Sequence, residues 1–217
     1  DDNERTKNWY SLIRCSGSSS KYGGEGGSYG IGKNAPFATS DLRTVLYSTY
    51  TLENNHAFQG VAKLVTHELK NGGKAQPVGY LGGPEGASIR SKDKIPRRFC
   101  REERGTDVII LGFKAENTWE EELELSVLEY FWPAISFGDL EIHIGNRTIT
   151  KENLAALLEA RSGAENFTAH QYYDAYNNST SLRFEKTLPK LKDVSVRILI
   201  GETELPKRIA MVRQSGM

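Results

Sequence analysis

Residues 26–33 read Gly-Gly-Ser-Tyr-Gly-Ile-Gly-Lys, and the segment after them, from Lys33 toward Leu42, predicts a helix. Pro36 falls in the first turn of this helix, where its missing N–H costs little. Glycines let the backbone fold closely around a chain of phosphates, and the start of a helix offers free N–H groups to an anion. The stretch therefore predicts an anion-binding loop, with a plain surface loop ahead of a helix as the alternative.

Outward from this loop, the hydrophobic pattern predicts an α+β chain. Asn54-Asn55 is a hairpin signal, and Thr150 is the expected N-cap of the helix that follows it. A change of texture near residues 114–117 predicts two domains, 1–115 and 116–217. The predicted strands cover residues 43–50, 58–67, 106–113, 140–144, 148–149, 194–200 and 208–212, and the predicted helices cover residues 9–13, 119–132 and 151–161.

Composition excludes several classes of protein. The chain has 217 residues, with 28 Lys and Arg against 28 Asp and Glu, so its net charge gives no indication of nucleic-acid binding. No apolar run is long enough for a membrane-spanning helix, and two cysteines, Cys15 and Cys100, are too few for a disulfide framework. We therefore expect a cytoplasmic protein without a membrane segment.

The ends of the chain suggest a piece of a longer protein. It opens with Asp1-Asp2-Asn3 and closes with Gly216-Met217. We expect any site in it to be incomplete.

Residues 27–34 nearly satisfy the P-loop pattern G-x-x-x-x-G-K-[ST], which binds nucleotide phosphates. Asn34 stands where Ser or Thr is required, and no apolar strand precedes the glycines as a P-loop needs. A P-loop-like phosphate-binding protein is therefore the less favoured interpretation.

A different family matches more of the chain. Ser19-Ser20-Lys21, a glycine spacer, Gly27-x-x-Gly30-x-Gly32-Lys33, a helix and a strand follow one another, and Gly105-Thr106 opens a later strand. This order over about residues 16–113 resembles the ATP lid and the Gly-Thr motif of the GHKL ATPase superfamily, which includes gyrase, the heat-shock chaperone, histidine kinases and MutL. Residues 27–38 and 42–49 resemble uncharacterised bacterial ATP-binding proteins of that superfamily more closely.

The resemblance implies a GHKL-type α/β sandwich, incomplete at its N-terminus, that binds ATP and Mg²⁺ in the intact protein. The superfamily's Glu/Asn helix and its Asp-x-Gly motif are missing here, so we expect this chain alone to be inactive. The implied cofactor-binding residues are Ser20 and Lys21 at the hinge of the lid, Gly27, Gly30, Gly32 and Lys33 at the phosphates, and Thr106 at the adenine. A solvated lysine and an ordinary strand threonine are the alternatives for Lys33 and Thr106.

Residues 116–217 have the position of the smaller transducer domain that follows the nucleotide domain in several GHKL ATPases. The resemblance makes Lys207 and Arg213 the candidates for a catalytic charge returned to the γ-phosphate, and solvated strand ends are the alternative. Tyr172, Tyr173 and Tyr176 lie at helical spacing and predict packing in a core or an interface.

The leading hypothesis for function is an ATP-driven conformational switch, in which the lid orders over the phosphates and a second domain or partner responds. The competing hypothesis is a non-enzymatic interaction module on the same scaffold, with self-association or a protein partner.

Overall fold

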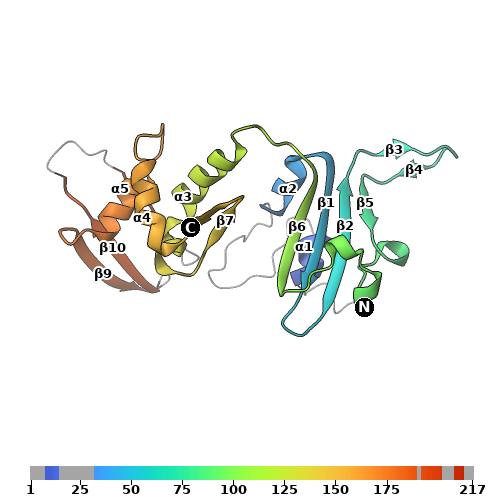
Figure 1. Ribbon diagram of the computed structural model, residues 1–217, viewed down its shortest axis with the longest axis horizontal. Helices are drawn as coiled ribbons and strands as arrows, with labels where there is room; N and C mark the ends of the chain where they lie inside the picture. Colours follow the sequence, from blue (N-terminus) through green and yellow to red (C-terminus); the bar gives the residue numbers. More distant parts are fainter. Residues whose placement is uncertain (1–7, 15–31, 190–191, 202–207, 213–217) are drawn as a thin grey trace. The chain divides into compact units, whose positions relative to one another are not determined.

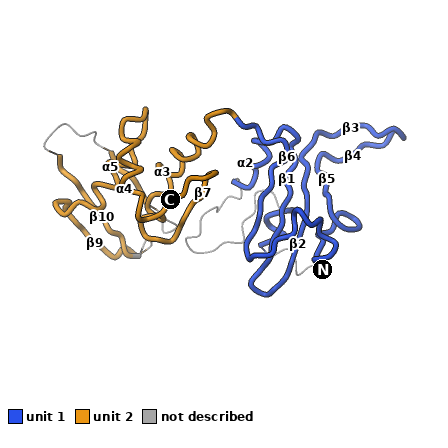
Figure 2. The backbone as a smooth tube through the Cα atoms, viewed as in Figure 1, with its two compact units in different colours: residues 1–115 blue, residues 116–217 orange. Residues whose placement is uncertain are grey.

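The structure is a computed structural model that describes residues 8–14, 32–189, 192–201 and 208–212. The chain divides into two compact units, Asp1–Ala115 and Glu116–Met217 (Figure 2). The point of division falls inside residues 114–117. The assignment of the units to a nucleotide-binding domain and a transducer domain stays a prediction.

Unit 1 is built on a four-stranded antiparallel sheet with the strand order β5-β2-β1-β6 (Figure 1). Its strands are β1 (Ser40–Tyr50), β2 (His56–Lys63), β5 (Val78–Leu81) and β6 (Gly105–Phe113). The hairpin predicted at Asn54-Asn55 is confirmed, and Asn54 takes the left-handed conformation with a φ of 60°. Strand β5 has no predicted counterpart, because four residues carry too little periodicity to be recognised.

The side chains of this sheet alternate between two apolar clusters. One cluster joins the sheet to the helices α1 (Asn8–Ile13) and α2 (Ala35–Ala38), and the other lies among residues of the opposite face. The buried members of the first are Ile13, Phe37, Val45, Tyr47 and Val61, and those of the second are Leu46, Phe58 and Ile95. The helices therefore cover the face that carries the odd-numbered residues of β1.

The helix predicted from Lys33 toward Leu42 is wrong at its end. A single 3-10 turn, η2 (Gly32–Asn34), leads into α2, and β1 already begins at Ser40. Ser40 is fully buried, and its Oγ accepts a hydrogen bond from the Thr44 N–H at 3.1 Å. The strand bulges between these two residues, and Arg43 has a φ of 48°. Helix α2 therefore ends where the pairing of β1 with β6 begins, although the local sequence favours a longer helix.

The strand predicted over residues 58–67 divides in two. β2 ends at Lys63, and β3 (His67–Glu68) pairs with β4 (Lys74–Ala75) in a separate small hairpin. Three further 3-10 turns precede β6: η3 (Pro84–Gly86), η4 (Lys92–Lys94) and η5 (Arg97–Phe99). The strand predicted over residues 106–113 is confirmed as β6.

Unit 2 begins with the long helix α3 (Trp119–Phe137), which continues past the predicted end at Trp132. Three glutamates occupy its first turn, as the helix dipole favours. Gly138 ends the helix in the left-handed conformation, with a φ of 81°. Pro133 lies inside the helix, is buried and does not end it.

The rest of unit 2 consists of two hairpins and two helices. The elements are β7 (Ile142–Ile144), β8 (Arg147–Ile149), α4 (Lys151–Ala160), α5 (Ala169–Asn177), β9 (Leu182–Leu188) and β10 (Lys192–Ile198). Thr150 caps α4, and its own N–H donates to Asn153 Oδ1 at 2.8 Å, so the predicted N-cap is confirmed. Helix α5 was not predicted as a helix.

The core of unit 2 lies between α3, α4, α5 and the first hairpin. Trp132 is buried at its centre, with the rings of Tyr173 and Tyr176 edge-on at centroid distances of 5.7 and 6.0 Å. Tyr172 also packs against this core, so the predicted packing role of the three tyrosines is confirmed. Each unit combines helices with antiparallel strands, which confirms the α+β class, and the GHKL sandwich stays a prediction.

The strand predicted over residues 194–200 is confirmed as β10, which ends at Ile198, whereas the strand predicted over residues 208–212 is wrong. β10 pairs with β9 rather than with residues 208–212, which form no strand. Ile209 and Met211 are 96% and 87% exposed. β9 was not predicted, because most of its residues are polar or charged and it lacks the pattern of an apolar strand. The local sequence also contains no signal for whether β10 pairs with the segment before it or with the segment after it. Within the described residues, no helix is long and apolar enough to cross a membrane.

Candidate functional site

Three of the nine predicted site residues lie in the described part of the chain: Gly32, Lys33 and Thr106. The other six lie outside the described residues: Ser20, Lys21, Gly27, Gly30, Lys207 and Arg213. The geometry of the candidate site therefore rests on the end of the glycine segment and on the sheet that it joins.

Lys33 lies in η2, directly after the glycines, and is partly buried. Its Nζ donates a hydrogen bond of 2.8 Å to the backbone carbonyl of Ser11, in α1. This bond holds the ammonium group between the start of α2 and the end of α1. Lys33 is thus fixed to the folded unit rather than free in solvent.

Lys63, at the end of β2, reaches the same place. Its Nζ donates to Asn34 Oδ1 and stands 4.3 Å from the centre of the Phe37 ring. Partial burial lowers the pKa of Lys63, and the positive charge of Lys33 lowers it further. Sequence analysis did not select Lys63, because only the pairing of β1 with β2 brings it beside the glycine segment.

The positive charge of these two lysines has no carboxylate partner in the described part of the chain. The ion pairs of unit 1 found there are Arg101 with Asp107 and Lys114 with Asp41, and neither involves Lys33 or Lys63. The acceptors of the two ammonium groups are a carbonyl, an amide oxygen and an aromatic face, all of them uncharged. Two adjacent cations in this setting favour the approach of an anion.

Gly32 leaves open space beside the backbone. A Cβ built on it would meet nothing within 4 Å among the described residues, whereas one on Gly60 would come within 2.8 Å of Leu46 Cδ2. Packing therefore explains the glycine at position 60 and does not explain the one at position 32. A glycine without a packing reason is consistent with a backbone that something approaches closely.

Thr106 lies some distance away along the sheet. Its Oγ1 is 2.8 Å from Thr49 Oγ1, and the Thr49 hydroxyl also lies 3.0 Å from the Gly105 carbonyl. Thr106 pairs with Thr49, whereas Ala62, next to Lys63, pairs with Thr44. Five residues of strand separate the two positions, or roughly 17 Å along the sheet. The structure does not bring Thr106 into contact with the lysine pair.

The donor atoms around the lysine pair do not fit Mg²⁺, which prefers carboxylate and water oxygens. The described residues contain no cluster of three or more His, Cys, Asp or Glu that could hold a metal ion. Any Mg²⁺ would need ligands from outside this set.

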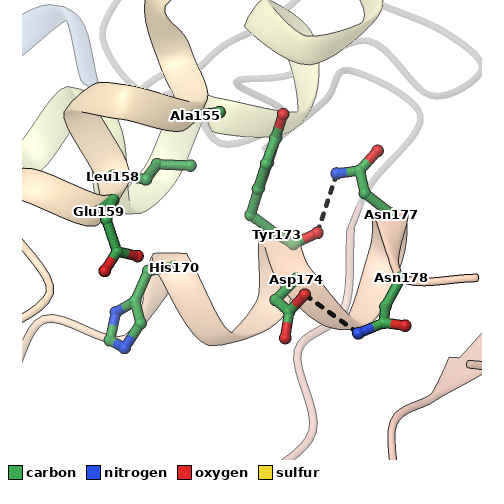
Figure 3. Close-up of a pocket in the computed structure, with 8 residues that line it drawn as sticks. All are labelled: Ala155, Leu158, Glu159, His170, Tyr173, Asp174, Asn177 and Asn178. Carbon is green, nitrogen blue, oxygen red and sulfur yellow. Dashed lines mark hydrogen bonds between the residues drawn. The ribbon is translucent and has the colours of Figure 1, made fainter. Parts of the chain in front are cut away.

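A shallow pocket of about 330 Å³ opens in unit 2, between α4 and α5 (Figure 3). Glu159, His170 and Asp174 give it a polar lining, and Asn178 Nδ2 donates to Asp174 Oδ1 at 3.4 Å. His170 also stacks on Phe167, with ring centroids 5.9 Å apart. None of the predicted site residues lines this pocket.

A second depression, of about 450 Å³, lies in unit 1. Its lining comes from the turns before β6 and consists of Lys92, Asp93, Ile95, Arg97, Cys100 and Glu102. It includes none of the predicted site residues either.

Of these places, the lysine pair combines a predicted site residue, Lys33, with two neighbouring positive charges that have no carboxylate partner among the described residues. Comparison with models of protein families, with curated proteins and with solved structures gives no match for this chain.

Proposed function

We propose that the chain is part of an ATP-binding conformational switch of the GHKL type, and that Lys33 contacts the phosphates of the nucleotide. The observation that carries the proposal is the pair of partly buried lysines, without a carboxylate partner among the described residues, at the end of a glycine-rich segment. An anionic ligand would remove the repulsion between them, and phosphate accepts charge-assisted hydrogen bonds from ammonium groups.

The remaining roles follow from the resemblance. Gly27, Gly30 and Gly32 offer backbone N–H groups to the phosphates, Ser20 and Lys21 form the hinge of the lid, and Thr106 lies at the adenine end. The resemblance also makes Lys207 and Arg213 the candidates for a catalytic charge at the γ-phosphate. Bound Mg²⁺ would neutralise phosphate charge, with ligands supplied from outside the described residues.

Calorimetric titration of the full-length protein with ATP and with a non-hydrolysable analogue, beside a phosphate-release assay, tests the proposal. A switch enzyme binds both nucleotides and releases phosphate from ATP alone. Binding without release supports a nucleotide-tuned interaction module. Absence of binding to either nucleotide contradicts the proposed function.

The chain of 217 residues by itself is expected to hydrolyse ATP near the background rate. It lacks the superfamily's water-activating carboxylate, and loss of a positioned base alone removes about 10²–10⁴-fold in rate. Hydrolysis at an ordinary ATPase rate, abolished by Lys33→Ala, would show that the pocket is complete within this chain.

Self-association is a second candidate function, and the hairpin of β9 and β10 favours it. Leu182 pairs with Ile198, and Phe184 pairs with Val196, so the four side chains share one face. Each of them is 43–55% exposed. Arg197, on the other face, lies against the Tyr176 ring at 4.2 Å, so the polar face meets α5 and the apolar face does not.

A second copy of the chain is the occupant that this face fits, because a two-fold contact joins the same patch of both subunits and the four apolar side chains are complementary to their own copies, with Lys186 beside them on the same face. Analytical ultracentrifugation is expected to show a concentration-dependent dimer that Phe184→Lys abolishes. Glu185→Lys, on the opposite face of the same strand, is the matched control. A monomer at all concentrations excludes this function.

A further inference from the structure

We infer that Lys63 is a second anion-binding residue, and that Lys33 and Lys63 together bind one multiply charged chain of linked phosphates. This inference rests on the proposed function and deepens it. It adds a residue outside the glycine motif, and it assigns the ligand to the class of diphosphates and triphosphates rather than single anions.

The fold holds the Lys63 ammonium group at a defined place. Lys63 follows Ala62, which pairs with Thr44, and it is the last residue of β2. From there the side chain reaches Asn34 Oδ1 on one side and the Phe37 ring on the other. Asn34 directly follows Lys33 in the chain, so the contact that orients Lys63 also brings it to its like-charged neighbour.

Both ammonium groups keep unused hydrogen-bond donors. An ammonium group carries three N–H donors. In the described part of the chain, Lys33 uses one of them on the Ser11 carbonyl, and Lys63 uses one on Asn34 while its charge also faces the Phe37 ring. A phosphate group has several acceptor oxygens and could take the donors that remain on both residues.

The charges favour a ligand with more than one negative charge. A single chloride-like ion neutralises one lysine and leaves the other repelled, whereas two linked phosphates can meet both. Partial burial strengthens the attraction, because fewer waters screen it. Burial, and to a smaller degree the positive charge of Lys33, lowers the pKa of Lys63, which agrees with this repulsion.

A purely structural role for Lys63 makes different predictions. If Lys63 only clamps α2 onto the sheet through Asn34 and Phe37, its loss lowers the thermal stability of the unliganded protein. Lys63→Met retains a long side chain against the Phe37 ring and removes the charge together with the hydrogen bond to Asn34 Oδ1. Lys63→Arg retains the charge, and Lys70→Met removes a charge from an exposed turn outside the lysine pair and serves as the matched control.

Titration calorimetry of the full-length protein with ATP and separately with inorganic pyrophosphate tests the inference, with thermal melting of each unliganded variant. We expect Lys63→Met to weaken binding of both probes about tenfold or more, since a charge-assisted hydrogen bond is lost. The melting temperature of that variant stays near the wild-type value. Lys63→Arg recovers most of the affinity, and Lys70→Met binds as the wild type does.

Unchanged affinity in Lys63→Met overturns the inference, as does a loss of the same size in Lys70→Met. A fall in melting temperature that Lys63→Arg does not repair assigns Lys63 to the clamp instead and also overturns it. If the wild type binds pyrophosphate but not ATP, and Lys63→Met loses that binding, the nucleotide function fails while this inference holds. If ATP binds and Lys33→Ala alone weakens it, the proposed function holds and this inference fails.

Discussion

The two units differ in whether a charge that is removed from solvent has a partner of opposite charge. In unit 2 the carboxylate of Glu124, 4% exposed, receives hydrogen bonds from Arg161 Nε at 2.9 Å and from Arg147 at 3.1 Å. In unit 1 the ammonium groups of Lys33 and Lys63 meet only uncharged acceptors among the described residues. Glu124 therefore has its counter-charges within the fold, whereas Lys33 and Lys63 have none among the described residues.

This difference motivates the proposal that the charge of Glu124 is structural and the charges of Lys33 and Lys63 serve a ligand. A buried carboxylate without partners costs several kcal/mol, so a fold that keeps one supplies its counter-charges. The repulsion between two like charges without a counter-charge is unfavourable for stability, and charges in such a setting are candidates for a functional role. Mutations at the two places are therefore expected to act on different measurements.

The largest expected effect is at Glu124. Glu124→Ala leaves two arginines facing a buried gap and is expected to destabilise unit 2 by about 3 kcal/mol, the lower end for a broken buried ion pair because the arginines are partly exposed. Urea unfolding measures it. Glu165→Ala, at an exposed position of the same unit, serves as the control. Equal small effects for the two variants would place Glu124 among the ordinary surface charges.

The next effect is on ligand binding. Lys33→Ala in the full-length protein is expected to weaken ATP binding about tenfold and ADP binding less, because the charge favours the terminal phosphate. The stability of the unliganded protein changes by about 1 kcal/mol or less, since one hydrogen bond to Ser11 is lost.

Calorimetry with both nucleotides measures this difference. Equal losses of affinity for ATP and ADP would show that Lys33 does not contact the terminal phosphate. Unchanged affinity for both nucleotides would assign Lys33 a structural role.

A smaller effect sharpens the contrast between packed and unpacked glycines. Gly32→Ala meets open space and is expected to leave stability unchanged or to raise it by about 0.5 kcal/mol, while weakening ATP binding if the backbone there approaches phosphate. Gly60→Ala places a Cβ 2.8 Å from Leu46 and is expected to destabilise unit 1. A stability loss at position 32 as large as that at position 60 would contradict the open space.

The smallest effect is on pH dependence. The pKa of Lys63 is lowered in the folded state, so the folded protein binds fewer protons than the unfolded chain as the pH rises toward the ordinary lysine pKa of about 10.4. This residue's contribution to stability is therefore unfavourable at neutral pH, and the cost is relieved as the pH approaches that value.

The difference in unfolding free energy between wild type and Lys63→Met, followed from pH 7 to pH 10, isolates this contribution. Tyr47 has a raised pKa through burial and changes stability in the opposite sense above pH 10, but it is common to both proteins. If the unfolding free energies of the two proteins change in parallel with pH, the Lys63 charge does not destabilise the folded state.

The sequence alone identified elements whose signals are local. The hairpin at Asn54-Asn55, the cap at Thr150 and the strand over residues 106–113 each depend on neighbouring residues, and all three are confirmed. Lys33 was also selected from sequence, through the resemblance of residues 27–33 to the ATP lid of the GHKL superfamily.

Tertiary structure decided what depends on distant partners. Strand pairing determines three features: where α2 ends, which segment lies beside β10, and how Lys63 comes close to Lys33. The segment beside β10 is β9 rather than residues 208–212. Register fixes which side chains meet, and residues 29 or 30 positions apart in sequence share a charge environment only once β1 and β2 have paired. No local pattern contains that information, so the sequence determined the glycine segment and its lysine, and the fold alone determined the second lysine beside it.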